Sequence, residues 1–265
     1  MKLWYQSLAR ETDATHYRAM LRKVIDSCVD PGTEVHIQGI VEAAGIGVHY
    51  GFLKHQDMKE VIYNALRAEK EGYDAFLIGN FSDVGICEAR EMVNIPVLGL
   101  CETSMHIACM MGATFGLVPV SEKQTPSKIE NARRYGVESR MVGALPLNSS
   151  PAGLKKAMVD KTLRDRVMAD FMAVAKRLIE RGAEVIIPAG GEFNVLLAED
   201  GIYEMERAPI VNGIIELVKM GELAAKLKKL TGRFTSKRLQ YAAPTGDFLK
   251  RIRNFYGADL YPGAE

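Results

Sequence analysis

Two carboxylates stand at the ends of two similar sequence phrases and could move protons. The phrases are GYDAFLIGNFSD at residues 72–83 and GAEVIIPAGGEF at residues 182–193. Each phrase has a glycine, an acidic residue two positions later, an apolar run and a turn. Asp83 closes the first and Glu192 lies near the end of the second, and a carboxylate can act as a general acid or base. Each also has a structural interpretation: Asp83 caps the following helix, and Glu192 is stabilised by a helix dipole.

Three of the five histidines fall between residues 36 and 55, which is a high local density of imidazoles. His49 and Tyr50 belong to a glycine-rich stretch, GIGVHYGF, and an imidazole titrates near neutral pH. A single histidine is nevertheless more often packed or exposed than catalytic. Imidazoles and carboxylates are also the ligands that a divalent metal takes, although no HExxH-like spacing is present. The metal set would be His36, His49, Asp83 and Glu192.

Short apolar runs alternate with longer amphipathic stretches, a pattern typical of βαβ units around a parallel sheet. Residues 58–72 and 166–182 each place apolar residues on one helical face. Gly72 and Gly182 end these two predicted helices. The predicted strands are KLWYQSL, EVHIQGI, DAFLIG, PVLGL, TFGLVPV, EVIIPA and API.

The order of these elements repeats along the chain. NIPVLGL follows the first phrase and RAPIVNG follows the second after a similar gap, which indicates a duplicated unit of helix, strand, turn, helix and strand. The predicted fold is therefore α/β, with two similar lobes related by a pseudo-two-fold and a cleft between them. We expect residues 1–113 plus 206–265 to form the first lobe and residues 114–205 the second. Strand ends facing one cleft could take a proton from one side of a carbon and return it on the other.

The bulk properties favour small-molecule chemistry. The formal net charge of +1 gives no basic field for nucleic acid, and no run approaches the ~20 apolar residues of a membrane span. The basic, aromatic stretch near the C-terminus is better interpreted as a solvated helix than as a nucleic-acid site. Four cysteines without a CxxC pair are predicted to be reduced thiols. We expect a cytoplasmic protein.

Several motifs together resemble the aspartate/glutamate/hydantoin racemase superfamily, and most of all its hydantoin (allantoin) racemase branch. The resemblance covers nearly all 265 residues. It implies two Rossmann-like lobes, a small-molecule substrate, a homo-oligomer and a cofactor-independent racemisation that uses one cysteine from each lobe. The stretches that carry it are DAFLIGNFSDVGICEAREMVNIPVLGLCETSMHIA, FGLVPV followed by RRYG, RGAEVIIPAGGE and TSKRLQYAAP.

The chain departs from that family where the resemblance expects the two cysteines, because Asn80 and Gly190 stand there. An amide is a negligible base and glycine has no side chain, so a two-thiol racemisation is not available through these positions. Cys87 and Cys101 are better interpreted as structural thiols than as replacements.

Other positions either match the family or carry side chains that can bind or deprotonate a substrate. The resemblance matches Glu192 to a glutamate of the aspartate and glutamate racemases, and Glu102 to one common in the hydantoin branch. Gln6 and Ser7 stand where the family often has a phrase that holds the substrate. The predicted catalytic residues are Glu192, Asp83 and His49. The predicted substrate-binding residues are Gln6, Ser7, Asn80, Phe81, Ser82, Gly190, Gly191, Glu102 and Tyr50.

Three functional hypotheses follow. The first is a superfamily enzyme that acts without cofactor at a carbon next to a carbonyl, in a small amino-acid-like or hydantoin-like substrate. The second is a hydrolase of a cyclic ureide or ring amide that uses a divalent metal. The third is a binding protein that kept the cleft and lost the reactive residues.

Overall fold

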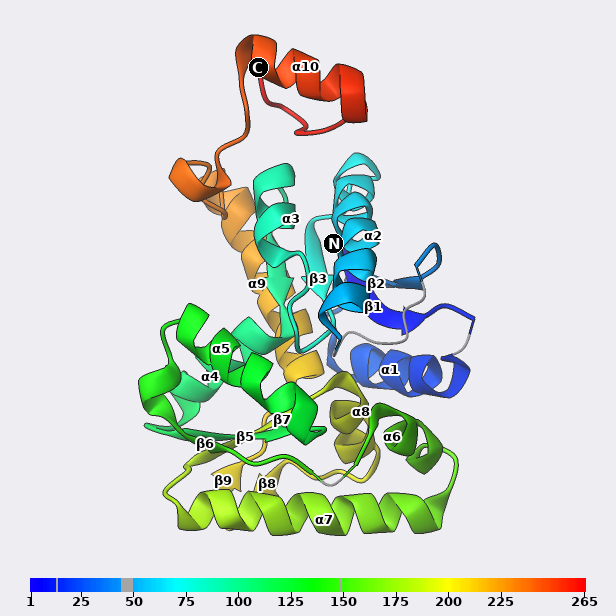
Figure 1. Cartoon of the computed structure of the whole chain (residues 1–265), viewed down its shortest axis with the longest axis vertical. Coiled ribbons are helices and arrows are strands. Elements are labelled where there is room, and N and C mark those ends of the chain that lie inside the picture. Colours follow the sequence, from blue (N-terminus) through cyan, green and yellow to red (C-terminus); the bar gives the residue numbers. More distant parts are fainter. Residues whose placement is uncertain (13, 44–49, 148) are drawn as a thin grey trace.

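The chain forms two α/β lobes, each built around a parallel sheet, in a computed structural model (Figure 1). The structure describes residues 1–12, 14–43, 50–147 and 149–265. The first sheet has the order β2-β1-β3-β4 and the second the order β6-β5-β7, while β8 and β9 pair as a short antiparallel ribbon. The strands are β1 (Lys2–Arg10), β2 (Glu34–Ile40), β3 (Ala75–Ile78), β4 (Val97–Gly99), β5 (Phe115–Pro119), β6 (Met141–Ala144), β7 (Val185–Ala189), β8 (Glu204–Met205) and β9 (Ala208–Pro209).

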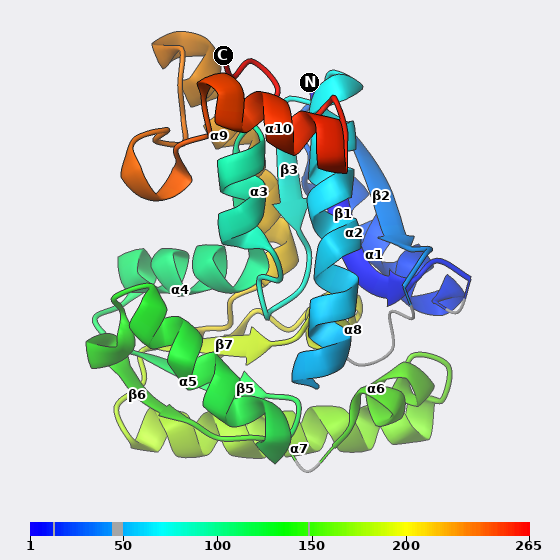
Figure 2. The ribbon, with the colours of Figure 1, turned by 45° about the horizontal axis from the view of Figure 1, so that its top comes forward.

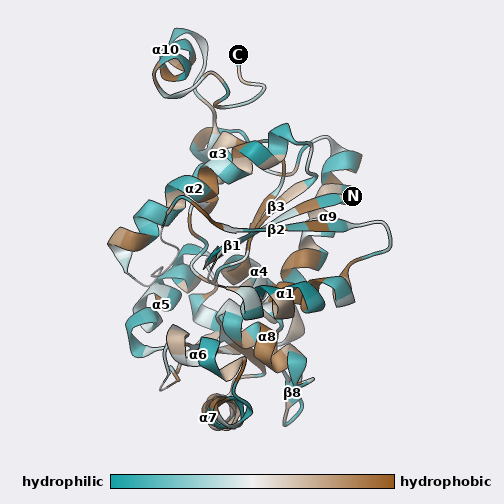
Figure 3. Cartoon of the chain, turned by 90° about the vertical axis from the view of Figure 1, so that its right-hand side faces the viewer, coloured by the Kyte–Doolittle hydropathy of each residue, from teal (hydrophilic) through white to brown (hydrophobic). Residues whose placement is uncertain are grey.

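Helices cover both faces of the first sheet and surround the second. The α-helices are α1 (Thr15–Cys28), α2 (Gly51–Lys70), α3 (Ile86–Met92), α4 (Leu100–Met111), α5 (Thr125–Arg134), α6 (Pro151–Ala157), α7 (Lys161–Glu180), α8 (Gly191–Glu199), α9 (Gly213–Thr231) and α10 (Gly246–Tyr256). Three short 3-10 turns, η1 (Glu122–Gln124), η2 (Glu138–Arg140) and η3 (Leu239–Tyr241), complete the described elements. Seen from the side, α10 stands at the end of the molecule remote from α7 (Figure 3).

The two sheets share one topology, which confirms the predicted α/β fold with two parallel sheets. β2, β1 and β3 of the first lobe correspond in order to β6, β5 and β7 of the second. The parallel bridge between Ile186 and Ile210 then takes the place of the β3–β4 pairing. The residues just after these two pairings begin α4 and α9 respectively. The repeated phrase therefore builds the same strand and turn twice.

β3 and β7 are continuous apolar runs because both faces of these strands are covered. All residues of β3 and of β7 are buried. Leu3 and Tyr5 of β1 pack with α1 and α9, whereas Trp4 faces α2 on the other side of the sheet. The cluster around Tyr5 also includes apolar residues of β5 and β7, so one hydrophobic core runs from the first lobe into the second.

The predicted strands agree with the structure except at three places. The two-residue β8 was not predicted. β6 was not among the predicted strands, because its four residues are only half-buried at a sheet edge and carry little apolar signal. API was predicted as a strand of the sheet and forms instead the two-residue β9 and the Ile210 bridge. We retain the lobe limits near residues 113 and 205 as a proposal. Among the residues that the structure describes, no helix is long and apolar enough to cross a membrane.

Buried polar contacts join the two lobes at the turn after β3. Asp83 is 2% exposed, and its carboxylate accepts the backbone N–H groups of Cys101 (2.9 Å) and Glu102 (2.8 Å) at the start of α4. Tyr135, which follows α5 in the second lobe, donates its hydroxyl to the same carboxylate at 2.6 Å. Asp83 thus caps α4, whereas the sequence indicated a cap on the next helix along the chain, α3, which begins after Gly85 without a side-chain cap. We call Asp83, Tyr135 and the start of α4 the Asp83 junction.

Replacing Asp83 with asparagine tests this junction. The amide can accept one of the two backbone N–H groups but presents its own N–H to the other. Asp83→Asn should therefore lower the free energy of unfolding by about 1–3 kcal/mol, whereas Tyr135→Phe removes one hydrogen bond and should cost about 1 kcal/mol. Urea unfolding at pH 5, followed by circular dichroism, measures both changes. Wild-type stability in Asp83→Asn would contradict the junction.

The loss caused by Asp83→Asn should grow as the pH falls. Burial raises the pKa of Asp83 from 3.8 to about 6, against the lowering effect of its hydrogen bonds to Tyr135 and the backbone. Because the folded value lies above the unfolded one, protonation of Asp83 stabilises the fold below pH ~4, and this contribution is lost as the pH rises through 6. It amounts to about 3 kcal/mol at most.

The measurement is the difference in unfolding free energy between wild type and Asp83→Asn at pH 4.5 and pH 7. Tyr135→Phe is the matched control, because it keeps the carboxyl group and should keep the pH dependence. A difference between wild type and Asp83→Asn that stays constant over this range would show that Asp83 does not titrate there.

Candidate active site

The turn after β3 is closed by its own side chains. Asn80 accepts the backbone N–H of Ser82 with its side-chain oxygen at 2.9 Å, and its carbonyl accepts the N–H of Asp83 at 3.0 Å. Gly79 must lack a side chain here, since a Cβ would overlap the ring of Tyr5. Asp83 has a φ of +46°, a left-handed conformation that the surrounding bonds hold in place. The position of the expected first cysteine therefore serves to shape the turn.

Lys128 of α5 reaches this turn from the second lobe. Its Nζ donates to the Phe81 carbonyl oxygen at 3.0 Å and to the Ser82 hydroxyl at 2.9 Å, and the residue is only 3% exposed. Burial lowers the pKa of Lys128, an effect that the nearby Asp83 opposes. Lys128 is not among the site residues predicted from the sequence. The available signal was its spacing, because Lys128 shares a helical face with the buried Ala132.

The turn after β7 meets the turn after β3. A Cβ on Gly191 would lie 2.6 Å from the hydroxyl of Tyr17 and 3.8 Å from the carbonyl oxygen of Gly79. A Cβ on Gly190 would lie 2.9 Å from Cγ2 of Val120. The buried Asn194 fixes this turn, because its amide donates to the Gly190 carbonyl at 2.8 Å and its oxygen accepts the N–H of Gly213 at the start of α9.

Glu192 occupies the first turn of α8, next to this meeting point. It is half-buried, and its carboxylate makes no hydrogen bond or ion pair with any residue that the structure describes. The charge of Glu192 acts on two buried tyrosines: burial, followed by this charge, raises the pKa of Tyr5, and burial, Tyr5 and Glu192 raise that of Tyr17. The hydroxyl of Tyr5 has no hydrogen-bond partner within the described residues. The arrangement offers one base and two hydroxyl donors.

Gln6 and Ser7 lie in hydrogen-bonded positions within the fold. The side-chain oxygen of Gln6 accepts from Trp4 at 3.2 Å and from Asn64 at 2.9 Å, and its amide donates to the carbonyl of Gln38 at 3.3 Å. Gln6 is fully buried on the α2 side of the sheet, opposite Tyr5. Ser7 accepts the N–H of Ala9 at 3.2 Å. The predicted role of both residues in substrate binding stays a prediction.

The remaining predicted residues are spread over several environments. Glu102 forms a paired contact with Arg90 of α3, both side chains being largely buried. Tyr50 is half exposed, and the ammonium of Lys123 lies over its ring at 4.7 Å. His49 lies outside the described residues. His36 packs its ring against Trp4 at 4.6 Å between centroids, on the α2 side of the first sheet.

The proposed metal ligands are not brought together in the part of the chain that the structure describes. His36 lies on the α2 side with Trp4, whereas Glu192 acts on Tyr5, which faces the opposite side. No group of three or more histidine, cysteine, aspartate or glutamate residues among the described positions could hold a metal ion. The described residues therefore offer no built metal site for the hydrolase hypothesis.

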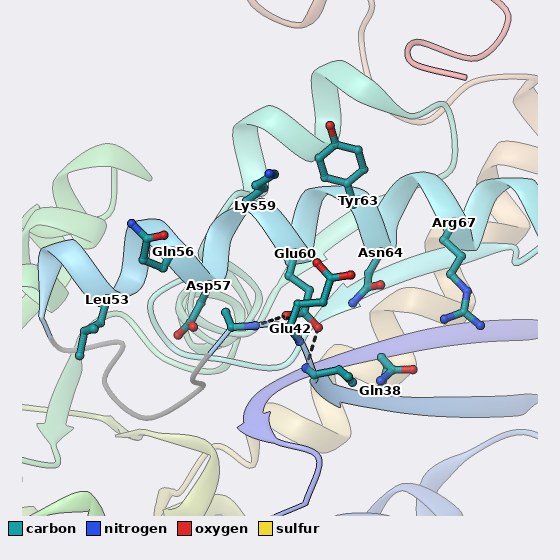
Figure 4. Close-up of a pocket in the computed structure, with 12 residues that line it drawn as sticks. Gln38, Glu42, Leu53, Gln56, Asp57, Lys59, Glu60, Tyr63, Asn64 and Arg67 are labelled. Carbon is teal, nitrogen blue, oxygen red and sulfur yellow. Dashed lines mark hydrogen bonds between the residues drawn. The ribbon is translucent and has the colours of Figure 1, made fainter. Parts of the chain in front are cut away.

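A pocket of about 800 Å³ opens between α2 and the end of β2 (Figure 4). Glu60 of α2 closes one side by accepting the backbone N–H groups of Val41, Glu42 and Ala43 at 2.7–3.0 Å. Asn64 and Arg67, one and two turns further along α2, also line it. None of the predicted catalytic or substrate-binding residues is among the residues that line this pocket.

Comparison with known sequences identifies the family. Residues 13–221 match the model of the Asp/Glu/hydantoin racemase family. A hydantoin racemase from Pseudomonas sp. (strain NS671) is 27% identical over 197 residues, 74% of this chain and 74% of the relative. A hydantoin racemase from Rhizobium meliloti is 26% identical over 178 residues, 67% of this chain and 69% of the relative.

Solved structures share the fold over nearly the whole chain. Allantoin racemase from Pseudomonas fluorescens aligns with a TM-score of 0.78 and 20% identity, over 93% of this chain and 98% of the other. Allantoin racemase from Klebsiella pneumoniae aligns with a TM-score of 0.75 and 20% identity, over 94% and 98%. Together with the family match, these likenesses confirm the predicted recognition and fold. The chain belongs to the Asp/Glu/hydantoin racemase family and is an enzyme of the racemase type.

Proposed function

We propose that this enzyme acts without a cofactor at a carbon next to a carbonyl, in a small hydantoin-like or amino-acid-like substrate. The observation that carries the proposal is the half-buried carboxylate of Glu192, unpaired among the described residues, beside Tyr5 and Tyr17 where the two strand-end turns meet. A carboxylate in this position can remove a proton from carbon, and buried hydroxyls can donate to the oxygen on which the negative charge develops.

The substrate class follows from the family and from the chemistry of these groups. The named relatives act on hydantoins and allantoin, which carry an acidic hydrogen on a carbon flanked by a carbonyl. Asn80 and Gly190 supply no thiol at the positions where the resemblance expects one. Proton transfer in this enzyme therefore relies on side chains next to those positions, and Glu192 is the first of them.

Proton NMR in deuterium oxide tests the reaction class. The wild-type enzyme is incubated with a panel of hydantoins, allantoin, amino acids and arylmalonates. Loss of the α-proton signal, with deuterium in its place, is the expected result for a carbon-acid mechanism. Ring opening without α-exchange would instead indicate a hydrolase, and a panel recovered with neither change would contradict the proposal.

Glu192→Gln tests the residue that carries the proposal. The substitution keeps the shape of the side chain and removes its basicity, so interconversion of substrate enantiomers should slow by at least about 100-fold. Chiral chromatography of the reaction mixture measures the rate. Glu199→Gln is the matched control: it lies in the last turn of the same helix, where Glu199 pairs with Lys23 at 2.8 Å, and should keep wild-type activity. An active Glu192→Gln enzyme would remove Glu192 from the mechanism.

A further inference from the structure

We propose that Lys128 is the second proton-transfer residue of this site, acting from the turn after β3 as Glu192 acts from the turn after β7. The inference rests on the proposed function and adds the identity of the second base. Lys128 lies in α5 of the second lobe, whereas its two hydrogen-bond partners, Phe81 and Ser82, lie in the first lobe. Figure 2 shows α5 beside α4. The amine is thereby fixed at the turn that contains Asn80, the position of the expected first cysteine.

The contacts of Nζ fit a neutral amine. A neutral lysine has two N–H donors and one lone pair, whereas an ammonium has three donors. Among the described residues, two acceptors bind the Lys128 amine, the Phe81 carbonyl and the Ser82 hydroxyl. Within the described part of the chain no carboxylate forms an ion pair with it, and the ring of Phe81 lies 5.8 Å from Nζ, near the limit of a cation–π contact. Because these two contacts engage both N–H groups of a neutral amine, the lone pair on Nζ remains available to accept a proton.

The charges around Lys128 come from three directions. Asp83 in the turn and Glu192 in α8 favour the ammonium, and Lys54 in α2 opposes it. Burial raises the pKa of the nearby Cys101 thiol, so Cys101 is uncharged near neutral pH. Burial outweighs the favourable charges and lowers the pKa of Lys128 below its ordinary value. A lysine with a lowered pKa has a neutral fraction nearer to physiological pH, as a general base requires. The interaction with Glu192 also links the two proposed bases electrostatically.

With these two residues, each direction of the reaction has one group that takes the α-proton and one group that returns a proton. In one direction the Lys128 amine takes the α-proton: the C–H bond breaks, an N–H bond forms and the electron pair moves to the carbonyl oxygen as an enolate. Protonated Glu192 returns a proton to the opposite face, so an O–H bond breaks and a C–H bond forms. In the other direction the Glu192 carboxylate takes the proton and the Lys128 ammonium returns it. Exchange with water resets the two groups.

Titration of Lys128 tests the amine independently of any substrate. Protein labelled with ¹³C at the lysine ε-carbon gives one signal for Lys128, assigned as the signal that disappears in Lys128→Met. Its midpoint should fall below the ordinary lysine value of about 10.4. A Lys128 midpoint at or above this ordinary value would overturn the assignment.

Exchange of single enantiomers distinguishes a base from a structural residue. Each enantiomer of a 5-monosubstituted hydantoin is incubated in deuterium oxide with wild type, Lys128→Met and Glu192→Gln. Lys128→Met should slow α-exchange of one enantiomer by at least about 100-fold while the other still exchanges without racemising, and Glu192→Gln should show the opposite preference. Lys176→Met, matched in chemistry and remote from the site, should behave as wild type.

The outcomes separate this inference from the proposed function. Equal slowing of both enantiomers in Lys128→Met, with α-exchange intact in the wild type, would overturn the role of Lys128 alone. Absence of α-exchange in the wild type would overturn the proposed function, and the use of Lys128 with it. Because Lys128→Met also removes two inter-lobe hydrogen bonds, Tyr135→Phe is the folding control: it removes the inter-lobe hydrogen bond from Tyr135 to Asp83 and keeps the Lys128 amine, so both enantiomers should still exchange.

Discussion

The structure depends on the burial of polar groups where α5 of the second lobe meets the first-lobe turn after β3. Isolated charges are costly to bury, by several kcal/mol each, unless hydrogen bonds or a change of protonation compensate them. Asp83 receives three donors, including the Tyr135 hydroxyl, and Lys128 has two acceptors and a lowered pKa. Since these bonds have fixed lengths, they hold the two lobes at one spacing, and the turns after β3 and β7 meet in consequence.

This spacing also gives the site its electrostatic character. Tyr5 and Tyr17 lie in the continuous core between the lobes, and burial keeps both hydroxyls protonated by raising their pKa values. A protonated hydroxyl in low-dielectric surroundings is a stronger hydrogen-bond donor than one in water. Glu192, half-buried at the edge of the same region, keeps contact with solvent. Carbon-acid chemistry needs a base that can exchange protons with water and hydrogen-bond donors that keep their protons. Glu192 suits the first role, and Tyr5 and Tyr17 suit the second.

The parallel sheets could be predicted from the sequence because fully buried strands are unbroken apolar runs. The repeated phrase indicated that the same unit is built twice. β6 was missed, because its edge position leaves no unbroken apolar run. The site was predictable only in part, because charge partners come from distant segments. Nothing local indicates that Arg90 pairs with Glu102, or that Lys128 reaches across to Ser82. A buried lysine contact depends on tertiary structure, and helical spacing alone shows only that the residue shares a face with apolar neighbours.

The two positions that the resemblance assigns to cysteines are now part of the packing, which explains why chemistry must come from their neighbours. Asn80 closes its turn through the Ser82 N–H, so its side chain is already committed. At Gly190 a Cβ would lie 2.9 Å from Cγ2 of Val120. The branched side chain of Val120 is packed in the core at the end of its strand, so moving it would cost free energy. A cysteine placed at residue 190 alone would therefore strain the turn before it could act on a substrate. The absence of thiols at these positions therefore involves the packing of both turns. The proposed proton-transfer pair consists of Glu192, two residues after Gly190, and Lys128, which reaches the turn of Asn80 from α5.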